Sequence, residues 1–211
     1  DRRQRQMCIR DSRTIEDWHN LYGKLVYWEM ELAAAPDSGM EEMLMMQKRE
    51  ANAAFNKFVR KNYESWLTTD NHPLMSPEIF KECIFPLLDN GEKVFFILID
   101  NFRLDQWRTI KPLLADIFNF DERLYTSILP TATQYARNAI FSGLMPLQIA
   151  KMFPGLWVDE DSEEGKNLNE SPLIATQFER YRRKVKFSYN KVNDSTGNER
   201  LLREFSNLAL N

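Results

Sequence analysis

Two points in the middle of the sequence carry side chains that could bind or transfer a phosphate group. At the first point, Asp100 directly follows the apolar run 94–99. A carboxylate at the carboxyl end of a buried strand is well placed to hold a metal ion. Asp is also a common helix N-cap residue. Asp100 by itself therefore predicts either a metal ligand or a cap of the helix expected after it.

At the second point, Thr131 and Thr133 follow the segment 125–129 and precede another predicted helix. Helix N-termini bind phosphate through their backbone N–H groups. A Thr hydroxyl there can attack phosphorus once a metal or a base removes its proton. Because Thr is also a common N-cap residue, these positions predict either a nucleophile or a cap.

Arg103 and Arg137 each lie a few residues beyond one of these two points. The planar fork of an Arg side chain matches the oxygens of a phosphate group. The two Arg residues are therefore candidates for substrate binding. The alternative for each is a salt bridge at the protein surface.

An alternation of strands and helices is expected to position these residues. The runs 94–99 and 125–129 are β-prone, a helix is predicted from about 104 to 118, and the segment 185–189 alternates apolar and polar residues. A strand, a helix and a second parallel strand make an α/β unit. We therefore expect an α/β domain with a mostly parallel sheet over residues 71–211.

Residues 1–70 predict a helical bundle instead. Two stretches repeat apolar residues at the three-and-four spacing of a helix face, and residues 35–39 interrupt them. The two faces comprise Trp18, Leu21, Tyr22, Leu25, Trp28 and Leu32, then Met40, Met43, Leu44, Gln47, Ala51, Ala54, Phe55, Phe58 and Asn62. Two amphipathic helices bury little apolar surface alone, so a third helix or a partner is expected. The whole chain is thus predicted to be α+β.

Composition excludes several classes of protein. The chain has 211 residues, a net charge of −3, two cysteines and two histidines. Two cysteines cannot form a tetrahedral thiolate zinc site, and no global basic field indicates nucleic acid. No apolar segment is long enough to span a membrane. We expect a cytoplasmic protein, without membrane insertion, that is a piece of a longer chain.

The residues around Asp100 and Thr133 resemble the opening motifs of a PglZ domain, a member of the alkaline phosphatase superfamily. In that superfamily an Asp ends the first strand, and a Thr or Ser at a helix start binds the same metal and attacks phosphorus. A Gly follows the nucleophile by about ten positions, as Gly143 follows Thr133. The resemblance implies that Asp100 and Thr133 are metal ligands and that Thr133, rather than Thr131, is the nucleophile.

Further site residues follow from the same resemblance. Arg103, Arg137 and Asn138 are expected to contact the substrate. The resemblance implies two zinc ions, with further ligands beyond residue 211, although a carboxylate and a hydroxyl also suit Mg²⁺ or Mn²⁺. Residues 1–211 alone are therefore expected to be an incomplete hydrolase with exposed apolar surface near the last helix. Asn101 stands where the common PglZ form has Gly, but Asn tolerates unusual backbone angles.

The helices before the PglZ motifs resemble the PorX type of response regulator of the type IX secretion system. The resemblance implies a metal-dependent phosphodiesterase or phosphatase, acting on nucleotides or oligonucleotides, that controls secretion. It also implies as partners a phosphorylated receiver domain in cis, a second copy of the chain, a sensor kinase and secretion-related regulators. Residues 1–11 are then the exit from the receiver domain. The alternative is a non-catalytic signalling module whose bundle mediates dimerisation or partner binding.

Overall fold

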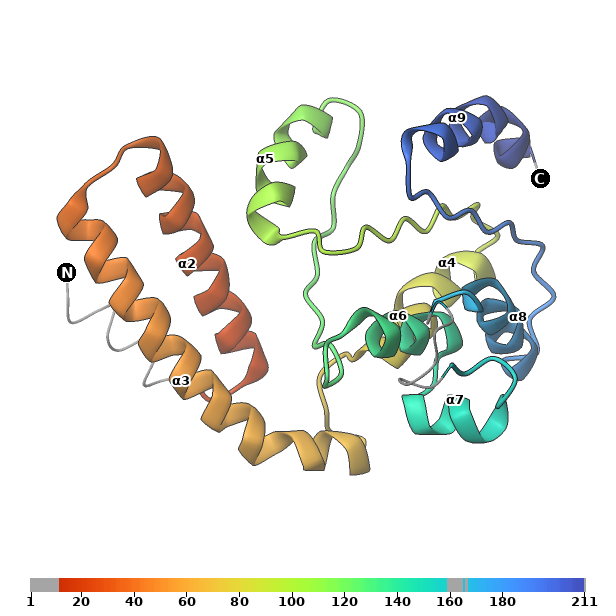
Figure 1. Ribbon diagram of the computed structural model, residues 1–211, viewed down its shortest axis with the longest axis horizontal. Coiled ribbons are helices and arrows are strands. Elements are labelled where there is room, and N and C mark those ends of the chain that lie inside the picture. Colours follow the sequence, from red (N-terminus) through yellow and green to blue (C-terminus); the bar gives the residue numbers. More distant parts are fainter. Residues whose placement is uncertain (1–11, 159–164, 166, 211) are drawn as a thin grey trace. The chain divides into compact units, whose positions relative to one another are not determined.

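The computed structural model describes residues 12–158, 165 and 167–210 (Figure 1). The expectations for residues 1–11 and for the acidic stretch 159–164 lie outside the described residues. The chain divides into two compact units, one from Asp1–Met75 with Phe95–Thr126 and one from Ser76–Val94 with Ser127–Asn211. None of the described helices combines the length and the apolar character that a membrane span requires.

In the first unit, helices α2 (Ile15–Ala34) and α3 (Ser38–Thr68) form a hairpin. Thr14 caps α2 in a capping box, in which its Oγ1 accepts a hydrogen bond from the N–H of Asp17 and Asp17 Oδ2 accepts one from the N–H of Thr14. Asp37 caps α3, because its Oδ1 accepts hydrogen bonds from the backbone N–H groups of Gly39 and Met40. Each helix therefore begins where a side chain satisfies its first donors.

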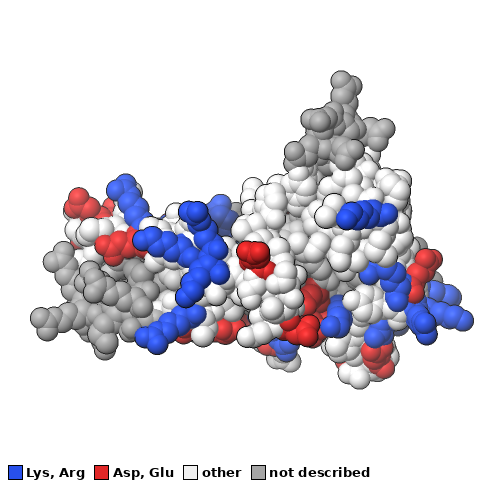
Figure 2. Space-filling model, turned by 90° about the horizontal axis from the view of Figure 1, so that it is seen from below, with Lys and Arg blue, Asp and Glu red and all other residues white. Residues whose placement is uncertain are grey.

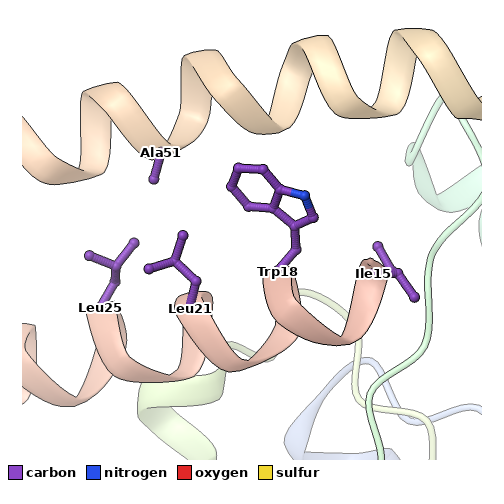
Figure 3. Close-up of a cluster of buried hydrophobic side chains, with 5 residues drawn as sticks. All are labelled: Ile15, Trp18, Leu21, Leu25 and Ala51. Atoms are coloured by element: carbon purple, nitrogen blue, oxygen red, sulfur yellow. The ribbon is translucent and has the colours of Figure 1, made fainter. Parts of the chain in front are cut away.

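The apolar faces predicted for these helices meet in the hairpin. Figure 3 shows Trp18, Leu21 and Leu25 pointing from α2 toward α3. The Trp18 ring lies 5.3 Å from the Phe55 ring and 5.8 Å from the Phe58 ring, measured between centroids. The helix-period pattern predicted this core in part, because Trp18, Leu21 and Leu25 are buried. Tyr22 and Trp28, which belong to the same predicted face, are 52% and 37% exposed.

A third helix, α5 (Leu104–Leu114), packs against α2 in the same unit. Arg108 Nη1 donates a hydrogen bond to the carbonyl of Gly23 at 2.7 Å. A Cβ at Gly23 would lie 3.2 Å from Arg108 Nη2, so the absence of a side chain lets the guanidinium approach. The expected third helix therefore comes from the segment that follows Asp100.

In its described part, the second unit contains a run of three short helices and, later in the chain, four further helices. The run is η1 (Ser76–Glu78), η2 (Phe80–Ile84, a π-helix) and α4 (Phe85–Asp89). The others are α6 (Thr133–Ser142), α7 (Pro146–Met152), α8 (Glu170–Arg180) and α9 (Ser195–Leu210). Helix α6 packs mainly against α8 and η1 (Figure 1).

Aromatic rings fill the interior of this second unit. Phe80, Phe85, Phe141 and Phe178 are all buried. The Phe178 ring lies 5.9 Å from that of Phe85 and 6.3 Å from that of Phe80. Helix α9 contributes little to this interior, since Leu202 is 67% exposed. The apolar surface expected near the last helix is therefore present.

The predicted mostly parallel sheet, and with it the α+β class, is wrong. The regular elements of the described residues are all helices. The only strand pairing recorded among these residues is an isolated parallel bridge between Met75 and Thr126. The runs 94–99 and 185–189 form no ladder with any described residue. The described chain therefore has a helical fold.

The run 94–99 shows why the sequence misled. Ile97 is 78% exposed and Ile99 is 58% exposed, so the segment is not a strand covered on both faces. β-branched and aromatic composition indicates that a segment would fit a half-buried sheet. A strand exists only where a second backbone pairs with it in a ladder, and no pairing of this run with another described segment is recorded.

Candidate functional site

The turn after Asp100 brings the chain from the exposed run into α5. Asn101 adopts φ +59°, in the left-handed region that Asn enters more readily than most residues. The N-cap of α5 is Arg103, so Asp100 does not occupy the cap position that was the alternative to a metal ligand. Asp100 itself is exposed.

Arg103 forms an ion pair within its own turn. Its Nη2 lies 2.8 Å from Asp105 Oδ2, and its Nε donates a hydrogen bond to Asp105 Oδ1 at 3.0 Å. The hydrogen bond and the charge of Arg103 hold the pKa of Asp105 below its ordinary value. Both side chains reach solvent, so this pair contributes little to stability.

Thr133 is the first residue of α6. The N-cap of that helix is Ala132, which has no side chain to satisfy the first backbone N–H groups. Neither Thr131 nor Thr133 therefore acts as the N-cap residue. Thr133 is half-buried, whereas Thr131 is exposed. The start of α6 thus presents a Thr hydroxyl at a helix N-terminus, where the helix dipole favours negative charge.

Gly143 ends α6 in the left-handed conformation, with φ +63°. A Cβ at this position would lie 2.8 Å from Gln177 Nε2 and 2.9 Å from Gln177 Cδ. Gln177 is held there because its Nε2 donates a hydrogen bond to the carbonyl of Ile140 at 3.0 Å. Both the backbone angle and the close approach of α8 therefore require glycine.

Arg137, one helical turn after Thr133, pairs with a carboxylate that is fully buried. Arg137 Nη2 lies 2.5 Å from Glu170 Oε1. Glu170 Oε2 accepts a hydrogen bond from the Tyr189 hydroxyl and lies 3.7 Å from Lys191 Nζ. Burial, followed by the hydrogen bond to Glu170 and its charge, raises the pKa of Tyr189 far above its ordinary value, so its hydroxyl stays protonated.

Asn138 is buried next to this cluster. Asn167 Nδ2 lies 3.4 Å from Asn138 Oδ1 and 3.4 Å from the carbonyl oxygen of Thr133, and it donates to both. Lys191 Nζ in turn donates to the carbonyl of Asn167 at 3.0 Å. Polar contacts thus connect α6 with Asn167, in the segment just before α8.

The predicted site residues fall in both compact units. Asp100 and Arg103 belong to the first unit, and Thr133, Arg137 and Asn138 belong to the second. The proximity of Asp100 to Thr133 therefore stays a prediction. Within the second unit, the structure brings Thr133, Arg137 and Asn138 together on one helix.

The two histidines are placed away from these residues in the sequence. His19 is half-buried on α2, and burial lowers its pKa. His72 Nδ1 lies 3.0 Å from the carbonyl oxygen of Pro73. The described part of the chain contains no group of three or more His, Cys, Asp or Glu side chains that could hold a metal ion. Asp100 and Thr133 alone do not make a catalytic zinc site, which takes three protein ligands.

The sequence analysis missed the partners of Arg137 and Thr133. Glu170, Tyr189, Lys191 and Asn167 were not singled out, although they surround the candidate site. An acidic residue in the first turn of a helix is common for reasons of capping and dipole. Glu170 therefore carried no sequence signal of its burial.

Charge on the described surface is mixed. On the face shown in Figure 2, basic and acidic side chains both occur, with uncharged surface between groups of them. This agrees with the small net charge of −3. The cationic groups near Thr133 are therefore a local feature.

Comparison with known proteins gives two adjacent matches. The BREX system PglZ alkaline phosphatase-like domain matches residues 79–207, which is more than half of the chain. The PorX response regulator linker domain matches residues 2–67. A search of the curated proteins finds no match. The first match contains both Asp100 and Thr133, and the second contains the α2–α3 hairpin.

Proposed function

The chain belongs to the PglZ alkaline phosphatase-like family, and we propose that it is a response-regulator effector that hydrolyses a phosphodiester or phosphomonoester. Residues 1–70 are the signal-transmitting bundle and residues 71–211 belong to the hydrolytic domain. Nucleotides or oligonucleotides are the proposed substrates. A receiver domain in cis, answering to a sensor kinase that controls type IX secretion, is the proposed source of the signal.

Thr133 is the proposed nucleophile. The observation that carries this assignment is its position as the first residue of α6, after an N-cap without a capping side chain. Thr133 Oγ1 loses its proton to solvent and forms a bond to phosphorus, while the bond from phosphorus to the leaving oxygen breaks and that oxygen takes up a proton from water. Water then hydrolyses the phosphothreonine. Arg137, Asn138 and Arg103 are the proposed substrate-binding residues, because guanidinium and amide donors match phosphoryl oxygens.

Alkaline phosphatase-like enzymes generally use metal ions. Asp100 and Thr133 are the oxygen donors that we propose for such an ion, with zinc as the proposed metal. The donor types also fit Mg²⁺ or Mn²⁺. Because the described residues contain no three-ligand group, the steps above are written only for the side chains of this chain.

Because residues 1–211 are expected to lack further metal ligands, the assignment of Thr133 is tested in the longer protein, whose hydrolysis of bis(p-nitrophenyl) phosphate is measured in the presence of zinc, magnesium or manganese. Thr133→Ala is expected to lower kcat by about 100-fold or more, because no other hydroxyl replaces a covalent nucleophile. Thr131→Ala is the matched control, since Thr131 lies two positions earlier and is exposed. Activity of Thr133→Ala equal to that of the unchanged, active protein would refute the assignment.

A second candidate function is a signalling and interaction module without catalysis. The observation that favours it is the exposed apolar surface of α3, where Met45 is 57% exposed and Met46 is 51% exposed. Met side chains adapt to varied partners. In this case Met45→Glu with Met46→Glu would abolish dimerisation measured by light scattering, while Thr133→Ala would leave signalling in cells unchanged. Loss of signalling in Thr133→Ala would exclude this candidate.

A further inference from the structure

We propose that Glu170 is a positioning residue for phosphoryl transfer, which holds the Arg137 guanidinium and the first turn of α6 in the geometry that Thr133 needs. This inference rests on the proposed function of Thr133. It assigns a role to a buried carboxylate that has no part in the proposed bond-making steps. Glu170 would act through Arg137 and Lys191 and would not itself touch the substrate.

Glu170 has two cationic neighbours and one hydroxyl neighbour. Its side chain is 0% exposed, yet it lies within reach of three donors from two other segments. Arg137 comes from α6, and Tyr189 and Lys191 come from the segment that follows α8. Because a buried charge is costly unless it is paired, these donors and Glu170 fix one another's positions.

Position along α6 links this cluster to the nucleophile. Arg137 lies four residues after Thr133, so the two residues share a face of the helix. The guanidinium is largely enclosed, with 16% of the side chain exposed, and cannot swing freely. Preorganised charge is more effective in catalysis than charge that must reorganise during the reaction.

A second route leads from Glu170 to the backbone of Thr133. Lys191 Nζ lies 3.7 Å from Glu170 Oε2 and donates to the carbonyl of Asn167 at 3.0 Å. Asn167 Nδ2 in turn donates to the carbonyl of Thr133. Loss of the carboxylate would therefore release both Arg137 and the contact that holds the start of α6.

The charges of the cluster also suit phosphoryl transfer. Arg137 and Lys191 carry two positive charges and Glu170 carries one negative charge, which leaves a net charge of +1 beside the start of α6. The Tyr189 hydroxyl remains a neutral donor. A fixed positive charge at this position stabilises the negative charge that develops on phosphoryl oxygens in the transition state.

Stability alone is a weak reason for such an arrangement. Apolar residues of similar volume are often as stabilising as a buried ion pair, or more so. The second unit also contains an ion pair that serves as a comparison, between Arg183 and Asp89, whose carboxylate is 55% exposed. A role in positioning predicts that the buried pair matters for kcat and that this comparison pair does not.

The experiment compares Glu170→Gln, Arg137→Lys and the double variant in the same longer protein that is used to test Thr133, with Asp89→Asn as the matched control. Glu170→Gln is expected to lower kcat by about 10–100-fold while KM changes by less than about threefold, since the lost interaction acts on the transition state. The kcat of the double variant should lie within about threefold of the kcat of the slower single variant, because both changes disturb the same guanidinium. Asp89→Asn should retain kcat.

Thermal unfolding separates the outcomes. A lower melting temperature with unchanged kcat in Glu170→Gln would overturn the proposal and leave a structural role. The proposal would also be overturned if the fold-losses of kcat in Glu170→Gln and Arg137→Lys multiplied in the double variant. If Glu170→Gln fails to fold, Lys191→Met is measured instead, and an unchanged kcat in that variant would overturn the proposal.

The same assays distinguish this inference from the proposed function. Activity that survives Thr133→Ala would refute the nucleophile, and the positioning role would fall with it. Activity that is lost in Thr133→Ala but unchanged in Glu170→Gln would refute only the role of Glu170.

Discussion

The α2–α3 hairpin and the α6–α8 region bury different kinds of side chain. The core cluster of the hairpin is apolar, with Trp18, Leu21 and Leu25 of α2 pointing toward α3 (Figure 3). All the buried polar or charged residues recorded among the described residues lie in the second unit. They are Ser76, Asn138, Ser142, Glu170 and Gln177.

The difference reflects what each interior fixes. Apolar burial is non-directional and supplies stability to a pair of long helices. Buried polar groups need partners at defined distances, so they specify geometry. Ser76 Oγ, for example, accepts a hydrogen bond from the N–H of Ile128 at 3.1 Å, and Gln177 reaches the last turn of α6. The unit that contains the candidate nucleophile is therefore the one with directional contacts in its interior.

The hairpin should be the region most sensitive to loss of apolar volume. Trp18→Ala is expected to lower the free energy of unfolding by about 3–5 kcal/mol, because it removes a buried aromatic side chain and leaves a cavity. Trp18 is 6% exposed and contacts two aromatic rings of α3. Chemical denaturation followed by circular dichroism measures the change.

Tyr22→Ala, on the same helix, is the control for this experiment. Tyr22 is 52% exposed, so its truncation should change the free energy of unfolding by less than about 1 kcal/mol. Similar losses of unfolding free energy in the two variants would contradict the view that the buried face of α2 supplies most of the stability of the hairpin.

The second unit should instead be sensitive to an added methyl group. Gly143→Ala places a Cβ on Gln177 and forces a left-handed backbone on Ala. Gly91 also has a positive φ, but no atom lies within 4 Å of its Cβ position. Gly91→Ala should therefore cost only the backbone term of about 1–2 kcal/mol.

Gly143→Ala is expected to exceed Gly91→Ala by about 1–3 kcal/mol, which is the usual cost of overpacking. Thermal unfolding of the two variants measures the difference directly. Equal losses of unfolding free energy would mean that Gln177 moves aside without cost. The hydrogen bonds of Gln177 would then not fix the position of its side chain.

The smallest expected effect concerns the N-terminus of α2. Hydrogen bonds from the backbone N–H groups of Thr14 and Arg13 lower the pKa of Asp17 from its ordinary value of 3.8. The stability that Asp17 contributes is therefore present above pH 3.8 and is lost as the pH falls through the lower pKa of the folded protein.

Asp17→Asn tests this pH dependence, because it keeps the size of the side chain and removes its charge. Urea unfolding of the protein and the variant should differ above pH 3.8 and converge below it. A difference in unfolding free energy that does not change with pH would show that the charge of Asp17 does not contribute to the capping box.

The sequence predicted most helices, whereas the roles that it assigned to Asp100, Thr133 and the substrate-binding residues stay predictions. It indicated the hairpin from apolar spacing and the end of α6 at Gly143, but it was wrong to predict a buried strand before Asp100. It identified the PglZ family from the residues around Asp100 and Thr133. It did not predict α7, and it assigned a sheet where the described chain has none.

The sequence by itself determined the features whose hydrogen bonds are local. A helix bonds each N–H to a carbonyl four residues away, and caps such as Thr14 and Asp37 act within three residues. Only the tertiary structure decided that the run 94–99 remains exposed and that Arg137 pairs with Glu170. Strand pairing and buried ion pairs form between groups that are distant in the sequence. Residue types alone do not determine which of these distant groups come into contact.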